Sequence, residues 1–200
     1  MDNLMLLAAA AGGYLLGSLS FSILLSHSRF GEDIRNHGSG NAGMTNMLRT
    51  FGKWAAVAVL AGDFLKGLAA ALVGQLLAGT PGALVAGFFA VVGHAFPLYF
   101  QFRGGKGVAT AAGFILGVQP LVLLIILAIF LLAVALSRMI SLGSILAAAA
   151  YPVSVTLLGY PAPQPLLALC LGLLVIWLHR GNLVRILRGE ERRVSFKKQP

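Results

Sequence analysis

The chain has 200 residues, of which 58% are hydrophobic and only 10% are charged. A soluble domain carries charge at roughly 25% of its positions, and the mean hydropathy here is +0.87. The composition therefore rules out a soluble enzyme and predicts an all-α integral membrane protein whose residues 1–200 form a single domain. Fifteen basic residues against six acidic ones give a net charge of +9.

Apolar segments predict seven transmembrane helices, since about 20 mainly apolar residues cross a bilayer. The first begins with Asp2 instead of a basic stretch, so we interpret it as a retained helix and not as a cleaved signal. The third and fourth are short, and Pro97 with the glycines of QFRGGKG predicts a break at membrane depth. The predicted spans cover about 4–26, 54–79, 83–100, 107–118, 120–137, 141–159 and 164–179.

Basic residues occur in every second connection between the predicted spans and are absent from the others. They gather at Arg29–Lys53, Arg103–Lys106, Arg138 and the tail 180–200, whereas the turns at 79–82, 117–120 and 159–165 contain none. The positive-inside rule then puts the N-terminus outside and the C-terminus in the cytoplasm. Attraction to anionic lipid headgroups accounts for much of this charge. Nucleic acid is not an expected partner, because no soluble module interleaves the charges with aromatic residues.

A polar loop, RNHGSGNAGMTNMLR at 35–49, follows the first span. Gly38, Gly40 and Gly43 match the dinucleotide pattern G-x-G-x-x-G, but a membrane helix and not a strand precedes them, so we do not favour a dinucleotide site. Glycines let N–H groups surround an anion, and a helix N-terminus favours negative charge. A flexible loop stays open as the alternative. The added donors would be Ser39, Thr45 and Asn46, with Arg35 and Arg49 as cations.

A second glycine-rich segment lies in GHAFPLYFQFRGGKGVAT at 93–110. It is not a nucleotide-binding phosphate loop, because Phe100 and Gly107 replace the glycine and the hydroxyl residue that such a loop requires. Gly104, Gly105 and Gly107 around Lys106 predict a second anion site at a helix start. The alternative is a cytoplasmic turn whose basic side chains reach the interface. We expect His94 to be a structural, hydrogen-bonded histidine.

The last span ends in HRGNLVRILRGEERR, where His179 and Asn182 share a helical face and Arg185 follows one step later. Taken alone, this is also typical of an interfacial helix end. Asp63 and Lys66 are spaced i, i+3 inside the second span and are expected to neutralise each other.

Three further side chains lie in apolar segments. Ser141 and Ser144 can bond to backbone carbonyls. The single cysteine, Cys170, is expected to pack at membrane depth. With one cysteine and a paired Asp63, the chain offers no thiolate or carboxylate cluster, so no metal is expected.

Six segments in order resemble the signatures of the bacterial acyl-phosphate:glycerol-3-phosphate acyltransferases: LLGSLSFSILLS, RNHGSGNAGMTNMLR, DFLKG, GHAFPLYFQFRGGKGVAT, SLGSI and HRGNLVRILRGEE. The resemblance runs from Leu15 to Glu191, with Met44, Gly181 and the longer basic tail less typical. It implies a monomeric seven-helix enzyme of the bacterial inner membrane, active at the cytoplasmic face and without a cofactor. Its substrates would be acyl phosphate and glycerol 3-phosphate, and its product lysophosphatidic acid for phospholipid biosynthesis.

The H-x4-D motif of other glycerolipid acyltransferases should then be missing, and it is. The residues five places after His27, His37, His94 and His179 are Glu32, Ala42, Tyr99 and Val184.

The resemblance also implies roles for residues. Ser39, Gly40, Asn41, Thr45 and Asn46 would hold the phosphate of acyl phosphate, and Arg49, Lys106, Ser144, His179 and Asn182 would surround glycerol 3-phosphate. The catalytic set would be Ser39, Lys106, Ser144, His179 and Asn182, with further phosphate contacts from Arg35, Gly38, Gly43, Gly104, Gly105, Gly107 and Arg185.

The proton acceptor stays open between His179 and the departing phosphate, and we favour the phosphate. An organic-phosphate transporter is the main alternative, although the two halves of the chain show no internal repeat. A lipid-binding subunit without turnover is a further alternative.

Overall fold

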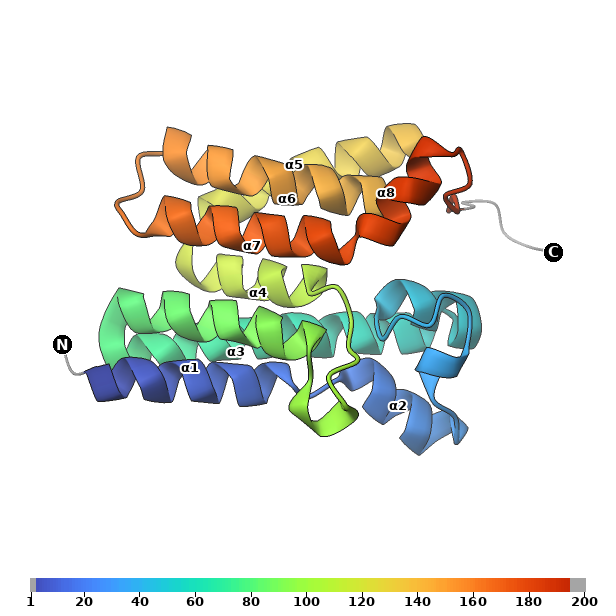
Figure 1. Ribbon diagram of the computed structural model, residues 1–200, viewed down its shortest axis with the longest axis horizontal. Coiled ribbons are helices and arrows are strands. Elements are labelled where there is room, and N and C mark those ends of the chain that lie inside the picture. Colours follow the sequence, from blue (N-terminus) through green and yellow to red (C-terminus); the bar gives the residue numbers. More distant parts are fainter. Residues whose placement is uncertain (1–2, 195–200) are drawn as a thin grey trace. The chain divides into compact units, whose positions relative to one another are not determined.

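The computed structural model describes residues 3–194, which form eight α-helices and two short 3-10 helices and contain no β-strand (Figure 1). In chain order the elements are α1 (Asn3–Gly17), α2 (Phe21–Phe30), η1 (Ile34–Asn36), α3 (Met44–Ala95), η2 (Leu98–Phe100), α4 (Val108–Val118), α5 (Pro120–Ser137), α6 (Ile140–Leu157), α7 (Gln164–Leu178) and α8 (Arg180–Leu187). The chain divides into two compact units, one ending at Gln119 and the other starting at Pro120.

Large apolar side chains cover the outside of the helices. Trp54 and Leu76 are each 86% exposed, and Leu157 is 81% exposed. Such a surface would be unfavourable in water and is typical of helices that face lipid. Four helical stretches are long and apolar enough to cross a membrane, Asn3–Phe30, Met44–Phe100, Pro120–Ser137 and Ile140–Leu157, and the bent pair α7 and α8 offers a fifth. The protein is therefore a multi-pass membrane protein.

The helix α3 contains two of the predicted spans. Its backbone leaves helical torsion angles at Gly52 and again at Ala78 and Gly79, where Gly79 has a φ of 61°. A Cβ on Gly74 would collide with the carbonyl of Gly82, so the backbones on either side of this break lie against each other. The chain therefore reverses direction at Ala78 and Gly79, at the edge of the predicted turn 79–82 and without a loop.

Close backbone contacts hold the first unit together. Gly13 and Gly17 of α1 rest on the backbone of Ala86 and Ala90 in the second half of α3, where an added Cβ would have no room. α1 and the second half of α3 accordingly lie side by side (Figure 1). In the absence of a hydrophobic driving force within lipid, small residues that allow such approach are a main source of helix association.

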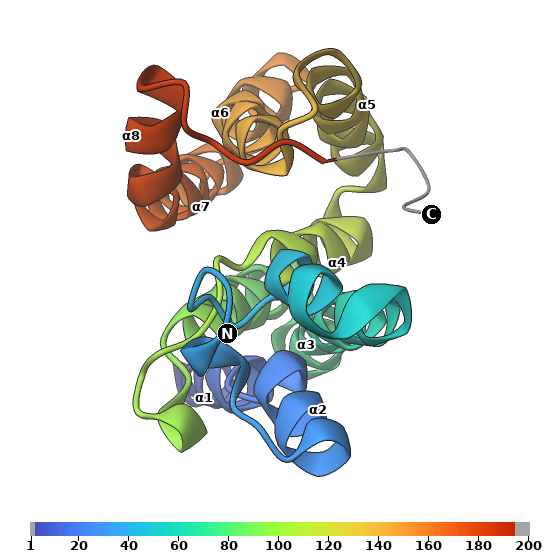
Figure 2. The ribbon, with the colours of Figure 1, turned by 90° about the vertical axis from the view of Figure 1, so that its right-hand side faces the viewer.

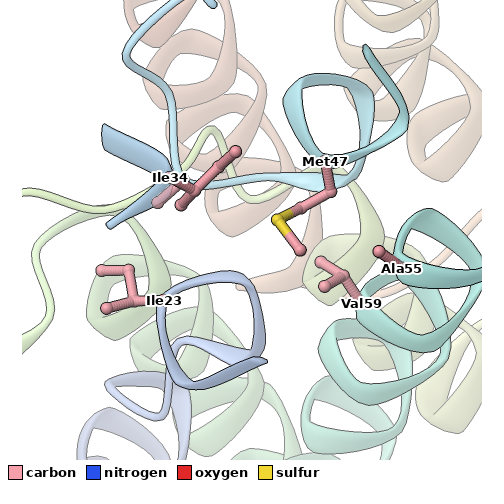
Figure 3. Packing of buried hydrophobic residues seen from close by; sticks show 6 residues of the cluster. Ile23, Ile34, Met47, Ala55 and Val59 are labelled. Carbon is pink, nitrogen blue, oxygen red and sulfur yellow. The ribbon is translucent and has the colours of Figure 1, made fainter. Parts of the chain in front are cut away.

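A small hydrophobic cluster anchors the loop between α2 and α3. Ile23 of α2, Ile34 of η1 and Met47 of α3 meet there, together with Ala55 and Val59 (Figure 3). Each of these five side chains is at most 5% exposed. The cluster fixes both ends of the polar loop at 31–43, called the first loop below.

In the second unit, α6 lies between α5 and α7 (Figure 2). α8 bends away from α7 by 60° at His179. After α8 the chain returns to the start of α6, where the N–H of Val194 donates to the carbonyl of Arg138 at 2.8 Å. Cys170 is exposed on α7. Residues 195–200 of the predicted basic tail lie outside the described residues.

Candidate active site

Asn46 holds the first loop in shape from the first turn of α3. Its Oδ1 accepts the N–H of Ser39 at 3.0 Å, and its Nδ2 donates to the carbonyls of Ile34 at 3.2 Å and His37 at 2.9 Å. The side chain is 1% exposed. All these partners are backbone groups of the loop, so Asn46 fixes the shape of the loop. As a direct phosphate contact it stays a prediction.

Three N–H groups of the first loop have acceptors within the loop or on α3. Those of Ser39, Gly40 and Gly43 already donate to Asn46, His37 and Asn41. Ser39 and Gly40 are exposed on the loop surface, and Thr45 lies half-buried in the first turn of α3. An anion here would meet the Ser39 hydroxyl and the positive end of the α3 dipole.

Arg35 ties the first loop to the segment that follows α3. Its Nε and Nη2 donate to both oxygens of Asp33, the shortest contact being 2.7 Å, and its Nη1 donates to the carbonyl of Phe100 at 2.8 Å. Hydrogen bonds from Arg35, opposed by partial burial, hold the pKa of Asp33 well below its usual range. Asp33 therefore offsets much of the charge predicted to attract phosphate, and the phosphate role of Arg35 stays a prediction.

The segment 96–107, called the second loop, closes against the end of α3. The N–H groups of Gly104 and Gly105 donate to the carbonyls of Ala95 and His94, each at 3.1 Å. These two donors therefore supply partners to carbonyls in the last turn of α3. In any helix the carbonyls of the last turn have no partner within the helix itself. A phosphate at this loop would rely on the half-buried Lys106 and on the N-terminus of α4.

Three ionisable side chains meet inside the first unit: Asp63, Lys66 and His94, called the buried trio below. Lys66 Nζ lies 2.9 Å from Asp63 Oδ1 and 3.0 Å from His94 Nδ1, and it donates to the carbonyl of Leu19 at 2.7 Å. The ion pair expected from the i, i+3 spacing is thus present, and His94 is hydrogen-bonded as expected. The contact at Asp63 Oδ1 does not have hydrogen-bond geometry, so charge attraction dominates there.

In the second unit, Glu191 accepts hydrogen bonds from three side chains, one at the start of α6 and two on α8. Its Oε1 accepts hydrogen bonds from Ser141 Oγ and Asn182 Nδ2, both at 2.7 Å, and its Oε2 accepts one from Arg185 Nε at 2.8 Å. Burial raises the pKa of this carboxyl, but the three hydrogen bonds and the Arg185 charge outweigh burial and leave the pKa below its usual value. Glu191 is therefore a carboxylate at neutral pH.

Contacts to neighbouring groups orient both His179 and Asn182. His179 Nδ1 lies 2.8 Å from the carbonyl of Val175, which can only accept, so Nδ1 carries a proton and the contact fixes the plane of the ring. Asn182 donates from its Nδ2 to Glu191, and this hydrogen bond fixes the orientation of the amide. Nearby on α6, Ser144 is 3% exposed and donates to the carbonyl of Ile140 at 3.0 Å, as expected.

The predicted site residues thus lie in three places: the first loop, the second loop and the second unit. Those of the first and second loops lie in the first unit, where Arg35 and Phe100 join the loops, whereas Ser144, His179, Asn182 and Arg185 lie in the second unit. The sequence interpretation missed two residues, Asp33 and Glu191. Asp33 could have been found as an acidic partner two places before Arg35, but no spacing rule pairs Glu191 with Ser141, 50 residues earlier.

Known proteins similar to this chain share one description. The sequence profile of the glycerol-3-phosphate acyltransferase family matches residues 7–189. Proteins named glycerol-3-phosphate acyltransferase are 50% identical over 182 residues in Pseudomonas fluorescens (90% of this chain, 94% of that protein) and 44% identical over 193 residues in Agrobacterium fabrum (96% and 94%).

Two crystal structures of PlsY (YgiH), an integral membrane glycerol 3-phosphate acyltransferase, have a similar fold. The glycerol 3-phosphate form is 38% identical with a TM-score of 0.90, over 95% of this chain and 96% of that one. The lysophosphatidic acid form is 36% identical with a TM-score of 0.87, over 95% of each chain. Sequence and fold agree over nearly the whole length, and the chain belongs to the glycerol-3-phosphate acyltransferase family.

Proposed function

We propose that this protein transfers a fatty acyl group from acyl phosphate to glycerol 3-phosphate, forming 1-acyl-glycerol 3-phosphate and inorganic phosphate. The product is lysophosphatidic acid, which enters phospholipid biosynthesis. The observation that carries the proposal is the match, over 95% of this chain, to a relative solved in glycerol 3-phosphate and lysophosphatidic acid forms. The two forms of that relative thus correspond to a substrate and a product of the same acyl transfer.

The acyl donor supplies most of the chemical driving force. Acyl phosphate is a mixed anhydride, so the glycerol hydroxyl can attack its carbonyl carbon directly. The bond between that carbon and the phosphate oxygen then breaks, and the phosphate leaves with the electron pair. No acyl-enzyme is needed, and the protein contributes positioning and charge stabilisation.

The orientation of His179 and Asn182 favours a role in holding the acceptor. The Val175 carbonyl and Glu191 hold the two side chains in fixed orientations, and imidazole and carboxamide groups can form hydrogen bonds with hydroxyl groups. The phosphate of glycerol 3-phosphate needs cations instead, and Lys106, Arg49 and Arg185 are the candidates. We propose that the departing phosphate takes the hydroxyl proton while His179 and Asn182 orient the glycerol.

The phosphate of the donor is assigned to the first loop. Ser39, Gly40, Asn41 and Thr45 would contact it, with Asn46 holding the loop in shape. Seven spans, an outside N-terminus and a cytoplasmic site in the bacterial inner membrane complete the proposal. The basic residues of both loops and of Arg180–Val194 support this orientation through the positive-inside rule.

An acyl-transfer assay in detergent tests the enzyme against its rivals. Purified protein, with no sealed compartment, should convert acyl phosphate and glycerol 3-phosphate into lysophosphatidic acid. A transporter would give no product there but would move glycerol 3-phosphate into sealed vesicles. A lipid-binding subunit would do neither, and either result with authentic substrates would contradict the proposal.

A further inference from the structure

The second loop lies along the last turn of α3. The N–H groups of Gly104 and Gly105 donate to carbonyls of that turn, as described above. A Cβ on Gly107, where φ is 76°, would approach Val91 Cγ1 to 2.6 Å. Lys106 stands between two glycines that both contact α3, so its backbone position depends on that helix end.

The ring of His94 fills one side of Gly105. A Cβ added to Gly105 would collide with His94 Nε2, and it would lie only 2.5 Å from the carbonyl oxygen of Ala42 in the first loop. Gly105 is therefore confined between the His94 ring and the first loop, with no room for any side chain. This is the second place, after Arg35 and Phe100, where the two loops meet.

The His94 ring cannot shift easily, because Lys66 holds its other nitrogen. Lys66 Nζ lies 3.0 Å from His94 Nδ1, and Asp63 Oδ1 lies 3.4 Å from the same nitrogen, while Nε2 faces Gly105. Asp63 and Lys66 belong to the first half of α3, His94 to the second half, and the Leu19 carbonyl to the α1–α2 connection. The buried trio thus ties three segments together directly behind Gly105, and its side chains are at most 5% exposed.

We propose that the buried trio is a positioning device for Lys106. It fixes the His94 ring, the ring fixes Gly105 against the first loop, and Gly105 fixes the backbone of Lys106 where the lysine can meet the phosphate of glycerol 3-phosphate. This inference rests on the proposed function, which assigns that phosphate contact to Lys106. Asp63, Lys66 and His94 are then positioning residues and not catalytic ones.

A double-mutant cycle between His94 and Lys106 tests the inference. His94→Gln leaves the Asp63–Lys66 pair intact but removes the ring and its contact with Lys66. A displaced contact of about 1 Å can cost on the order of 100-fold, so we expect kcat/KM for glycerol 3-phosphate to fall about 10- to 100-fold. KM for acyl phosphate should change less than about 2-fold. The two substrates separate a positioning effect from general loss of active protein.

Lys106→Ala should lower kcat/KM for glycerol 3-phosphate by about 10- to 150-fold, the usual value of a charge-assisted contact. If His94 acts through Lys106, adding His94→Gln to that variant should cost less than about 2-fold more, because the contact it positions is already gone. Ser154→Ala removes a buried hydroxyl that only bonds the carbonyl of Ala150, and it serves as the matched control with no effect in either background.

The inference would be contradicted if His94→Gln lowered kcat/KM for glycerol 3-phosphate by the same factor in the wild-type and Lys106→Ala backgrounds. It would also be contradicted if His94→Gln lowered kcat/KM equally for both substrates. His94→Asn keeps a polar group near Lys66 but not the ring beside Gly105, and it should behave as His94→Gln does. Failure of both variants to fold would make the trio a folding element and would also overturn the inference. Failure of the proposed function is distinguishable, since the wild-type protein itself would then make no lysophosphatidic acid.

Discussion

At the scale of single residues, most polar side chains of the candidate site face a partner of this chain that fixes their orientation. The Val175 carbonyl fixes the ring plane of His179, and Glu191 sets the amide orientation of Asn182. Groups whose orientation is already fixed need no rearrangement during a reaction, which is how preorganised groups lower a barrier.

Substitution of His179 separates a base from an orienting group. An obligatory base is worth about 10²- to 10⁴-fold, and Asn cannot take a proton at neutral pH. We predict that His179→Asn retains more activity than His179→Ala, and that the acidic limb of its pH profile persists because phosphates titrate near about pH 6. Steady-state rates across pH check this. Equal losses in both variants, with the limb abolished in His179→Asn, would make His179 the base.

The Glu191 carboxylate makes stability depend on pH. Its pKa is lower in the folded protein than in the unfolded chain, so the unfolded chain binds more protons as pH falls. The stability that the Glu191 carboxylate contributes is fully present above the ordinary carboxyl pKa of about 4.3. It is lost as the pH falls through the lower pKa of Glu191 in the folded protein.

We therefore predict that acidification below that value lowers the unfolding temperature of the wild type more than that of Glu191→Gln. Asp33 titrates in both proteins, so the difference isolates Glu191. Thermal unfolding in detergent measures it, and parallel pH curves for the two proteins would contradict the assignment.

At the scale of elements, the two loops are shaped by residues outside them. Asn46 on α3 holds the first loop, and the end of α3 holds the second. Sequence reasoning found Asp63 and Lys66 because an i, i+3 pair follows from helix geometry alone. It could not assign Arg35 to Phe100 or Glu191 to Ser141, because those contacts depend on how distant segments fold together.

Asn46→Ala should disrupt the first loop. Three hydrogen bonds of the Asn46 side chain would be lost, each worth about 0.5–1.5 kcal/mol net. The carbonyls of Ile34 and His37 would keep only the N–H groups of His37 and Gly40. We expect a lower unfolding temperature together with a raised KM for acyl phosphate. Ser154→Ala, which removes a hydroxyl that bonds the carbonyl of Ala150 in the second unit, is the control. If Asn46→Ala lowered the unfolding temperature but left the KM for acyl phosphate unchanged, the shape of the first loop would not determine donor binding, and the prediction would be wrong.

At the scale of the whole molecule, hydropathy and composition predicted an all-helical membrane protein, and the fold and the family confirm that much. They predicted the reversal at 79–82 as a turn, but the helical pattern continues almost to Gly79 and the reversal needs only two residues with non-helical torsion angles. A hydropathy window cannot resolve so short a break. The orientation across the membrane stays a prediction.

Cysteine labelling of intact cells tests that orientation. Thr80 and Ala162 lie exposed in turns predicted to face outward, and Arg103 lies exposed in the second loop. In a Cys170→Ala background, cysteines at the first two positions should react with an impermeant thiol reagent, whereas one at Arg103 should react only after permeabilisation. The reverse pattern would place the candidate site outside the cell.

The identity of the acyl donor is the most direct test of the central claim. Purified protein should be given glycerol 3-phosphate with acyl phosphate, acyl-CoA or acylated carrier protein in separate reactions, without added metal. We predict lysophosphatidic acid from acyl phosphate alone, with one inorganic phosphate released for each lysophosphatidic acid formed. Product from acyl-CoA or the carrier protein, or phosphate released without lysophosphatidic acid, would contradict direct transfer from acyl phosphate to the glycerol hydroxyl.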